Sequence, residues 1–204
     1  MLYPIGIQSF KEIRTGGYVY VDKTDLVYKL THSGKYFFLS RPRRFGKSLI
    51  LSTLEAYFEG RKDLFEGLAI AELEKNWKAL PVIHIDFNTG DYETVDGLLN
   101  RLDKTLTEQE NKHGQEKAAD DSGLRFEYLI KNVYESTGNK VVVLIDEYDK
   151  PLLETIGFPE MQEKMRNKLR DMYSVLKTCD EYIQFAMLTG VTKFGHLNVF
   201  SGLN

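Results

Sequence analysis

The sequence predicts an α/β fold built on a mainly parallel sheet, and two observations carry this prediction. Four short apolar runs have the length and composition of buried strands, and they lie at residues 36–40, 81–87, 141–146 and 184–190. The intervals between these runs carry apolar residues at helical spacing. Strands that alternate with helices form parallel sheets through right-handed crossovers. We therefore expect one sheet with its strands parallel and helices packed against it.

Four helices are predicted from the intervals, each by one apolar face. The faces are Ile50, Leu51, Leu54, Tyr57 and Phe58; Leu98, Leu99, Leu102 and Leu106; Phe126, Leu129, Ile130, Val133 and Tyr134; and Met161, Met165, Leu169, Met172, Tyr173 and Leu176. Gly60 and Gly138 are expected to end the first and third of these helices. Residues 111–123 lack apolar periodicity and are expected to form a mobile loop. Near the start, residues 18–30 predict a short strand leading into a helix, with Asp22 as its N-cap.

The bulk composition indicates one domain over residues 1–204 and limits the classes of function. A net charge of −3 argues against direct binding of nucleic acid, since domains of that kind carry a basic excess. Cys179 is the only cysteine, which excludes an internal disulfide and favours a reducing compartment. The sequence shows no signal peptide and no apolar run long enough for a membrane span. We expect a cytoplasmic protein without a membrane partner.

The segment "SRPRRFGKS" between the first predicted strand and the first predicted helix ends like a phosphate-binding loop. In such loops the backbone N–H groups cradle phosphates, the lysine reaches the β- and γ-phosphates, and the hydroxyl binds Mg²⁺. We expect the lysine to face solvent as a phosphate ligand. The alternative is an ordinary strand–helix turn. The expected nucleotide contacts are Arg43, Arg44, Phe45, Gly46, Lys47, Ser48 and Leu49.

Arg41 stands where the GxxxxGK[ST] pattern has its first glycine. Pro42 follows and favours extended geometry at position 41, so we expect a negative φ at Arg41 and a turn over residues 43–46. Three arginines in this loop place positive charge around the expected phosphates. They are expected either to contact phosphate or to pair with Asp22 or Asp25.

Acidic and hydroxyl side chains follow two of the other predicted strands. Asp146 ends the third strand and is expected to hold Mg²⁺ together with Ser48. Glu147 is the predicted general base that activates water for attack on the γ-phosphate. Thr189 ends the fourth strand, where it would sense the γ-phosphate or simply bond to the loop backbone. Asp149 is expected to cap a helix or form a local salt bridge, with a place in the metal shell as the alternative.

These segments resemble the bacterial AAA-ATPase-like family, on the strength of "RPRRFGKSLILSTLEAYFEG", "PVIHIDF", "VVVLIDEYDKPLL" and "FAMLTGVTKF". That family itself uses "RPRRFGKS", so the resemblance implies that Arg41 is a family trait. It further implies a P-loop NTPase three-layer sandwich with strand order 5-1-4-3-2, and ATP with Mg²⁺ as ligands. Lys47 and Ser48 match the Walker A pair, and Asp146 and Glu147 match the Walker B pair. Family members typically continue into a C-terminal nuclease-like domain of the PD-(D/E)XK type.

The resemblance also predicts that the chain is a fragment, with the fifth strand lying beyond Asn204. The strand at residues 36–40 would then be a sheet edge, covered by residues 17–22 or by a second molecule, so an oligomer is possible. The leading hypothesis is an ATPase domain that regulates an attached or partner effector. A nucleotide-binding switch with little or no hydrolysis and a small-molecule kinase are the alternatives. The absence of an NKxD motif favours adenine over guanine.

Overall fold

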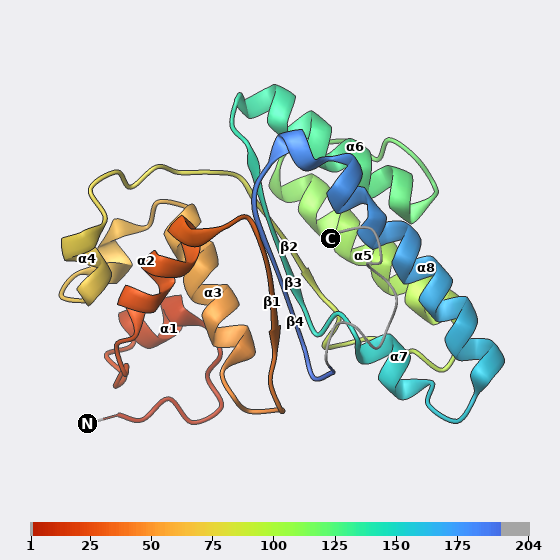
Figure 1. Ribbon diagram of the computed structural model, residues 1–204, viewed down its shortest axis with the longest axis horizontal. Helices are drawn as coiled ribbons and strands as arrows, with labels where there is room; N and C mark the ends of the chain where they lie inside the picture. Colours follow the sequence, from red (N-terminus) through yellow and green to blue (C-terminus); the bar gives the residue numbers. More distant parts are fainter. Residues whose placement is uncertain (1, 193–204) are drawn as a thin grey trace.

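The computed structural model describes residues 2–192, which contain one four-stranded sheet (Figure 1). Its strands are β1 (Tyr36–Ser40), β2 (Val82–Asp86), β3 (Val141–Asp146) and β4 (Ile183–Gly190). All pairings are parallel, in the order β1-β4-β3-β2, so the predicted strands and their direction are confirmed. The order differs from the expected five-stranded one in lacking a fifth strand within the described residues. That strand was predicted beyond Asn204.

Helices cover both faces of the sheet and make the fold a three-layer sandwich (Figure 1). One layer holds α1 (Phe10–Thr15), α2 (Thr24–Ser33), α3 (Lys47–Phe58), the 3₁₀ turn η1 (Lys62–Phe65) and α4 (Ala69–Leu73). The other holds α5 (Val95–Lys112), α6 (Ser122–Thr137), α7 (Lys150–Glu154), α8 (Pro159–Thr178) and the 3₁₀ turn η2 (Asp180–Tyr182). None of the helices within residues 2–192 is long and apolar enough to cross a bilayer.

The ends of the predicted helices follow local backbone chemistry. Gly60, after α3, and Gly138, after α6, both have positive φ, at 71° and 64°, which ends a helix at little steric cost. Asp121 caps α6, because its side chain accepts hydrogen bonds from the N–H groups of Gly123 and Leu124. The connection between α5 and α6 is therefore shorter than predicted, since both helices extend into it.

The predicted strand near the start of the chain is wrong. Tyr18 forms only an isolated bridge with Leu2, and within residues 2–192 this segment forms no ladder with β1. Asp22 is not the N-cap of α2 either. Its carboxylate accepts hydrogen bonds from Thr24 N at 2.8 Å and from Ala69 N at 2.7 Å. Asp22 therefore joins the start of α2 to the start of α4.

Two apolar clusters form the core, one on each face of the sheet. Val141, Val143 and Ile145 of β3 pack in the cluster beneath α5, α6 and α8. Val142 and Leu144 pack in the other cluster, beneath α3. Alternate residues of β3 thus face opposite layers, which explains why a central parallel strand reads as one continuous apolar run.

A buried ion network joins α5 to α6. The Arg125 side chain is only 2% exposed, and its guanidinium donates to both carboxylate oxygens of Glu110 at 2.5 Å. It also donates to Asp103 at 2.5 Å. The bidentate geometry satisfies a charge that would be costly to bury alone.

Replacing Arg125 with Ala should lower the free energy of unfolding by about 3 kcal/mol, because Glu110 would stay buried without its partner. Urea denaturation followed by circular dichroism measures this loss. Lys117→Ala is the matched control, since Lys117 pairs with Asp103 on the exposed surface and should matter little. Equal stabilities for the two variants would show that the buried network does not hold α5 against α6.

Candidate nucleotide site

The loop between β1 and α3 makes its turn where the sequence predicted it. Arg41 N donates to Gly190 O at 3.1 Å, so the ladder continues one residue beyond β1. Arg41 is not among the described residues with positive φ, as predicted. The turn instead uses left-handed geometry at Arg44 (φ 66°) and Gly46 (φ 76°). The strain at Arg44 was not predicted, and for a residue with a Cβ it costs about 1–2 kcal/mol.

Lys47 opens α3, and the expectation that it faces solvent is wrong. Its side chain is 3% exposed, and its ammonium lies 3.0 Å from Glu147 Oε1. The same ammonium donates to the carbonyl oxygens of Arg41 at 3.1 Å and Pro42 at 3.4 Å. An ammonium has three donors, and these three oxygens can use all of them. The loop carbonyl groups and Glu147 thus enclose the ammonium, and its buried charge is fully partnered.

Asp146 ends β3 and lies against the end of β4. Its Oδ1 accepts a hydrogen bond from the Thr189 hydroxyl and another from Glu147 N at 3.0 Å. Within residues 2–192 the hydrogen bonds of this carboxylate all end on Oδ1, which leaves Oδ2 as a potential metal ligand. Thr189 is fully buried, and its hydroxyl bonds to Asp146 rather than to the loop backbone.

Glu147 connects the acidic strand end to the phosphate loop through its ion pair with Lys47. Its backbone has φ 51°, a second left-handed residue with a Cβ. The side chain is 15% exposed, so water reaches it. The structure thus brings together Lys47, Asp146, Glu147 and Thr189 from three different segments.

The remaining predicted contacts surround this centre without a direct bond to it. Ser48 is half-buried in the first turn of α3, next to Lys47. Arg43 and Arg44 are exposed. No arginine of the loop forms an ion pair with Asp22 or Asp25 in the part of the chain that the structure describes. The pairing alternative is therefore not observed.

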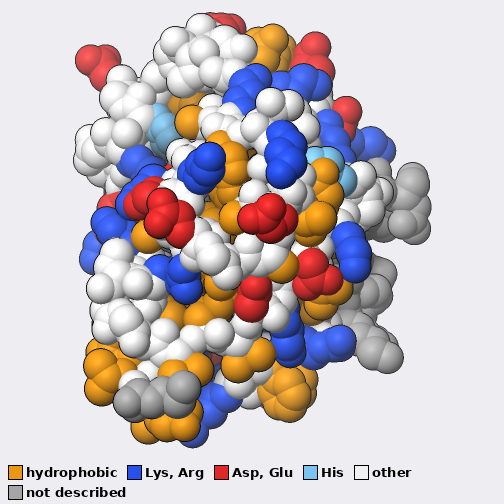
Figure 2. Space-filling model, turned by 90° about the vertical axis from the view of Figure 1, so that its left-hand side faces the viewer, with side chains coloured by type: hydrophobic (Ala, Val, Ile, Leu, Met, Phe, Trp, Pro, Cys, Tyr) orange, Lys and Arg blue, Asp and Glu red, His pale blue; other side chains and the backbone are white. Residues whose placement is uncertain are grey.

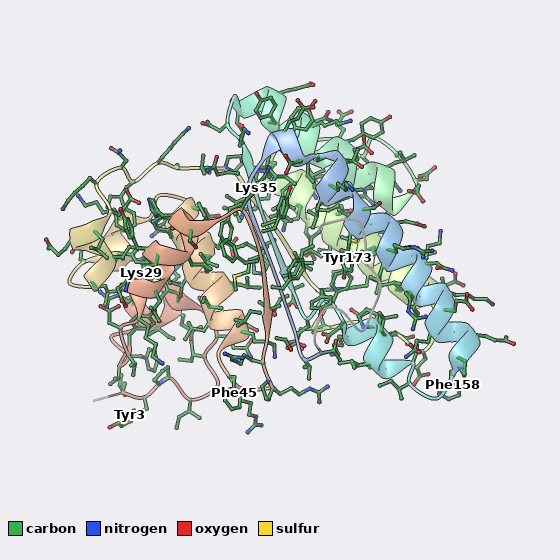
Figure 3. All side chains as sticks on the ribbon, viewed as in Figure 1. Tyr3, Lys29, Lys35, Phe45, Phe158 and Tyr173 are labelled. Carbon is green, nitrogen blue, oxygen red and sulfur yellow. The ribbon has the colours of Figure 1, made fainter. Side chains whose placement is uncertain are left out.

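An apolar cavity of about 700 Å³ lies beside the phosphate loop. It is lined by the N-terminal segment, α2, β1 and α3, including Val19, Leu26, Leu39, Phe45, Leu49 and Ile50. Tyr3 and Phe45 are 65% and 68% exposed and lie toward the same end of the molecule (Figure 3). Hydrophobic side chains gather at this lower end of the face seen in Figure 2. The cavity and its exposed aromatics were not predicted, because they depend on how the N-terminal segment packs.

The oxygen atoms of Ser48 and Asp146 suit a metal ion that is bound by the protein and a nucleotide phosphate together. No group of three or more His, Cys, Asp and Glu side chains that could hold a metal occurs among residues 2–192. Ser48 and Asp146 offer one hydroxyl and one carboxylate oxygen. Mg²⁺ keeps several waters and takes one or two protein oxygens together with phosphate, so these two residues fit it.

Asp149 has a role that sequence reasoning missed. It lies at the N-cap position of α7, as one of the expectations had it, but its side chain makes no capping hydrogen bond. The carboxylate is instead fully buried and accepts hydrogen bonds from Val191 N, Thr192 N and the Thr192 hydroxyl. Tyr148 beside it donates to Thr192 O at 3.2 Å. Burial, and then the charge of Asp149, raises the pKa of Tyr148 to about 12, so this hydroxyl stays protonated. The signal in the sequence was an acidic residue two positions beyond the Asp-Glu pair.

Comparison with known proteins gives the chain a family. The family described as "Predicted AAA-ATPase" matches residues 4–200. The chain is also similar to a protein of Azotobacter chroococcum mcd 1 described as "Uncharacterized protein in vnfD 5'region", with 43% identity over 202 residues. The match covers 98% of this chain and 39% of that protein. No solved structure matches the chain. The chain belongs to the AAA-ATPase-like family of predicted AAA-ATPases.

Proposed function

We propose that this chain binds ATP with Mg²⁺ at the phosphate loop and hydrolyses it. The observation that carries the proposal is the 3.0 Å contact between Lys47 Nζ and Glu147 Oε1. This contact joins a phosphate-loop lysine to a carboxylate at the end of the central strand. The family membership supports nucleotide binding independently of this geometry.

In the proposed reaction each side chain has one role. The γ-phosphate takes the place of Glu147 as the partner of Lys47, which then stabilises charge on the transferred group. Glu147, once released, accepts a proton from the attacking water. Ser48 and Asp146 would hold Mg²⁺, and the metal would supply positive charge that neutralises the phosphates. Thr189 keeps Asp146 in one orientation through its hydrogen bond.

The apolar cavity beside the loop is the proposed site of the base. It shares Phe45, Gly46 and Leu49 with the phosphate loop, so a bound triphosphate would extend its nucleoside toward it. Adenine suits an apolar pocket better than guanine, because fewer of its polar groups must lose water without a partner. The exposed ring of Phe45 is placed to stack on a base.

The second candidate is a nucleotide-dependent switch with little or no hydrolysis. The Lys47–Glu147 pair favours it, because a bound phosphate must compete with Glu147 for the lysine and would rearrange both loops. The chain spans 39% of the length of its relative. An attached effector, for example a nuclease-like domain, therefore belongs to the proposal for the full-length protein. Binding and phosphate release measured on one preparation separate the two candidates.

Lys47→Ala should weaken ATP binding by about 100-fold or more, because a charge-assisted contact to phosphate is lost. Isothermal titration calorimetry measures the affinity, and circular dichroism checks the fold. Lys29→Ala, on the exposed surface of α2, is the control and should bind like the parent (Figure 3). An unchanged affinity in Lys47→Ala would refute the site.

Glu147→Gln should bind ATP–Mg²⁺ at least as tightly as the parent, because a neutral amide competes less with phosphate for Lys47. It should slow hydrolysis by about 10²-fold or more, the usual loss when a general base is removed. Steady-state phosphate release measures the rate, and Glu154→Gln, in the exposed part of α7, serves as the control. Equal turnover in parent and Glu147→Gln would exclude Glu147 as the base. ATP binding without turnover in the parent chain would favour the switch.

Phe45→Ala should weaken ATP binding by about 5- to 100-fold and leave inorganic triphosphate binding unchanged, because stacking on a base contributes about 1–3 kcal/mol. Phe158→Ala is a matched control, since Phe158 is also 68% exposed but lies at the start of α8 (Figure 3). If Phe45→Ala changes neither affinity, the base does not stack on this ring.

A further inference from the structure

The candidate site has two halves, the phosphate loop at residues 41–48 and the acidic loop at residues 146–149. The segment at residues 189–192, which is the end of β4 and the two residues after it, bonds to both halves. On the phosphate-loop side, Arg41 N donates to Gly190 O at 3.1 Å, and the Ser40 hydroxyl donates to Val191 O at 2.9 Å. On the acidic side, Tyr148 N donates to Thr189 O at 2.9 Å. The 189–192 segment is therefore bonded to both loops at once.

Asp149 is the anchor of this segment on the acidic side. Val191 N lies 2.9 Å from Asp149 Oδ2 and 3.2 Å from Oδ1. Thr192 donates to Oδ2 twice, from its backbone N–H at 2.6 Å and from its hydroxyl at 2.5 Å. Asp149 is fully buried, and no lysine or arginine within residues 2–192 forms an ion pair with it. These donors are what stabilises the buried carboxylate, so the segment and Asp149 hold each other in place.

The packing around this anchor is too close for another side chain. A Cβ at Gly190 would lie 2.5 Å from Asp149 Oδ1 and 2.6 Å from Cε1 of the Tyr148 ring. Atoms at these distances overlap, so Gly190 is required for close approach. The contact therefore fixes the 189–192 segment against residues 148–149 within narrow limits.

We propose that Asp149 is a positioning residue that sets the spacing between the phosphate loop and the acidic pair. The inference rests on the proposed function. Mg²⁺ would have to meet Ser48 from one half and Asp146 from the other, so the metal-dependent part of nucleotide binding needs both halves in register. Binding of the phosphates without metal needs no ligand from Asp146, so it does not require Ser48 and Asp146 to be in register. Asp149 itself touches neither metal nor phosphate, because its oxygens are occupied by Val191 and Thr192.

The variant Asp149→Asn tests this role through two affinities, both measured by calorimetry. One is the affinity for ATP in EDTA, and the other is the affinity for ATP with Mg²⁺. An amide offers one acceptor oxygen and turns its NH₂ group toward backbone donors, so the anchor is lost at nearly constant volume. We expect ATP affinity in EDTA to stay unchanged. The gain in affinity on adding Mg²⁺ should fall by about 10- to 100-fold, the usual effect of losing an outer partner of a metal site.

Two further variants separate positioning from general stability. Glu110→Gln alters another buried carboxylate, in the network with Arg125, and should lower the melting temperature while keeping the full Mg²⁺ gain. Ser40→Ala removes the hydrogen bond to Val191 O on the phosphate-loop side of the segment and leaves Asp149 intact. It should reduce the Mg²⁺ gain in the same direction and less strongly.

The outcomes are distinct. A full Mg²⁺ gain in Asp149→Asn overturns the inference, as does an equal loss of affinity in EDTA and in Mg²⁺. If Asp149→Asn does not fold, Ser40→Ala decides, and an unchanged Mg²⁺ gain there overturns the inference. No ATP binding by the parent chain, or no gain from Mg²⁺, refutes the proposed function and with it the inference. ATP binding with a full gain in every variant refutes the inference alone.

Discussion

The parallel direction of the strands is the constraint on which the candidate site depends. In the observed register Ser40 pairs with Gly190, and Asp86 pairs with Asp146, so the carboxyl ends of the strands meet at one edge of the sheet. Loops that leave this edge carry the lysine, the acidic pair and the threonine although they are far apart in sequence. A parallel sheet needs both faces covered by helices, and this burial is what makes the strand ends fixed points. The side chains in the loops that follow the strand ends are therefore held in fixed positions relative to one another.

The ion pair between Lys47 and Glu147 shows how this edge is arranged without a nucleotide. Both side chains are largely shielded from water, at 3% and 15% exposed, and each neutralises the other. A buried lysine without such a partner would be costly. In the proposed mechanism a phosphate replaces the carboxylate, and the charge balance of the lysine is kept throughout. The same exchange leaves Glu147 to act on water only once phosphate is present. In the nucleotide-free structure Glu147 is the partner of the Lys47 ammonium, and in the proposed reaction phosphate replaces it.

Much of the fold could be predicted because it follows from local patterns. The run at residues 141–146 is buried on both faces, and its apolar continuity predicts a central strand without knowledge of its neighbours. Gly60 and Gly138 end their helices for reasons of backbone geometry alone. The strand predicted near Tyr18 does not form, and the nearby bond of Asp22 to Ala69 joins residues that are 47 positions apart, a contact that periodicity cannot predict.

The site was less predictable than the fold, because its contacts join segments that are far apart in the sequence. Residue types and spacing pointed to Lys47, Asp146, Glu147 and Thr189, which the structure brings together. The burial of Lys47 could not be predicted, since it depends on carbonyl groups of the folded loop. Nor could the bonds of Asp149 to Val191 and Thr192, which join segments more than 40 residues apart. The apolar cavity likewise exists only after distant segments pack.

Backbone strain marks the same two halves of the site. Among the described residues, Arg44 and Glu147 are the ones with positive φ that are not glycine. Arg44 lies in the phosphate loop, and Glu147 follows the acidic strand end. Each conformation costs energy that a glycine would avoid, and such residues persist where surrounding contacts hold them. At Glu147 those contacts are the N–H bond to Asp146 and the ion pair to Lys47. The strain at Glu147 thus depends on the pairing that a phosphate would break, so nucleotide binding would act on the backbone of the acidic loop as well as on its side chain.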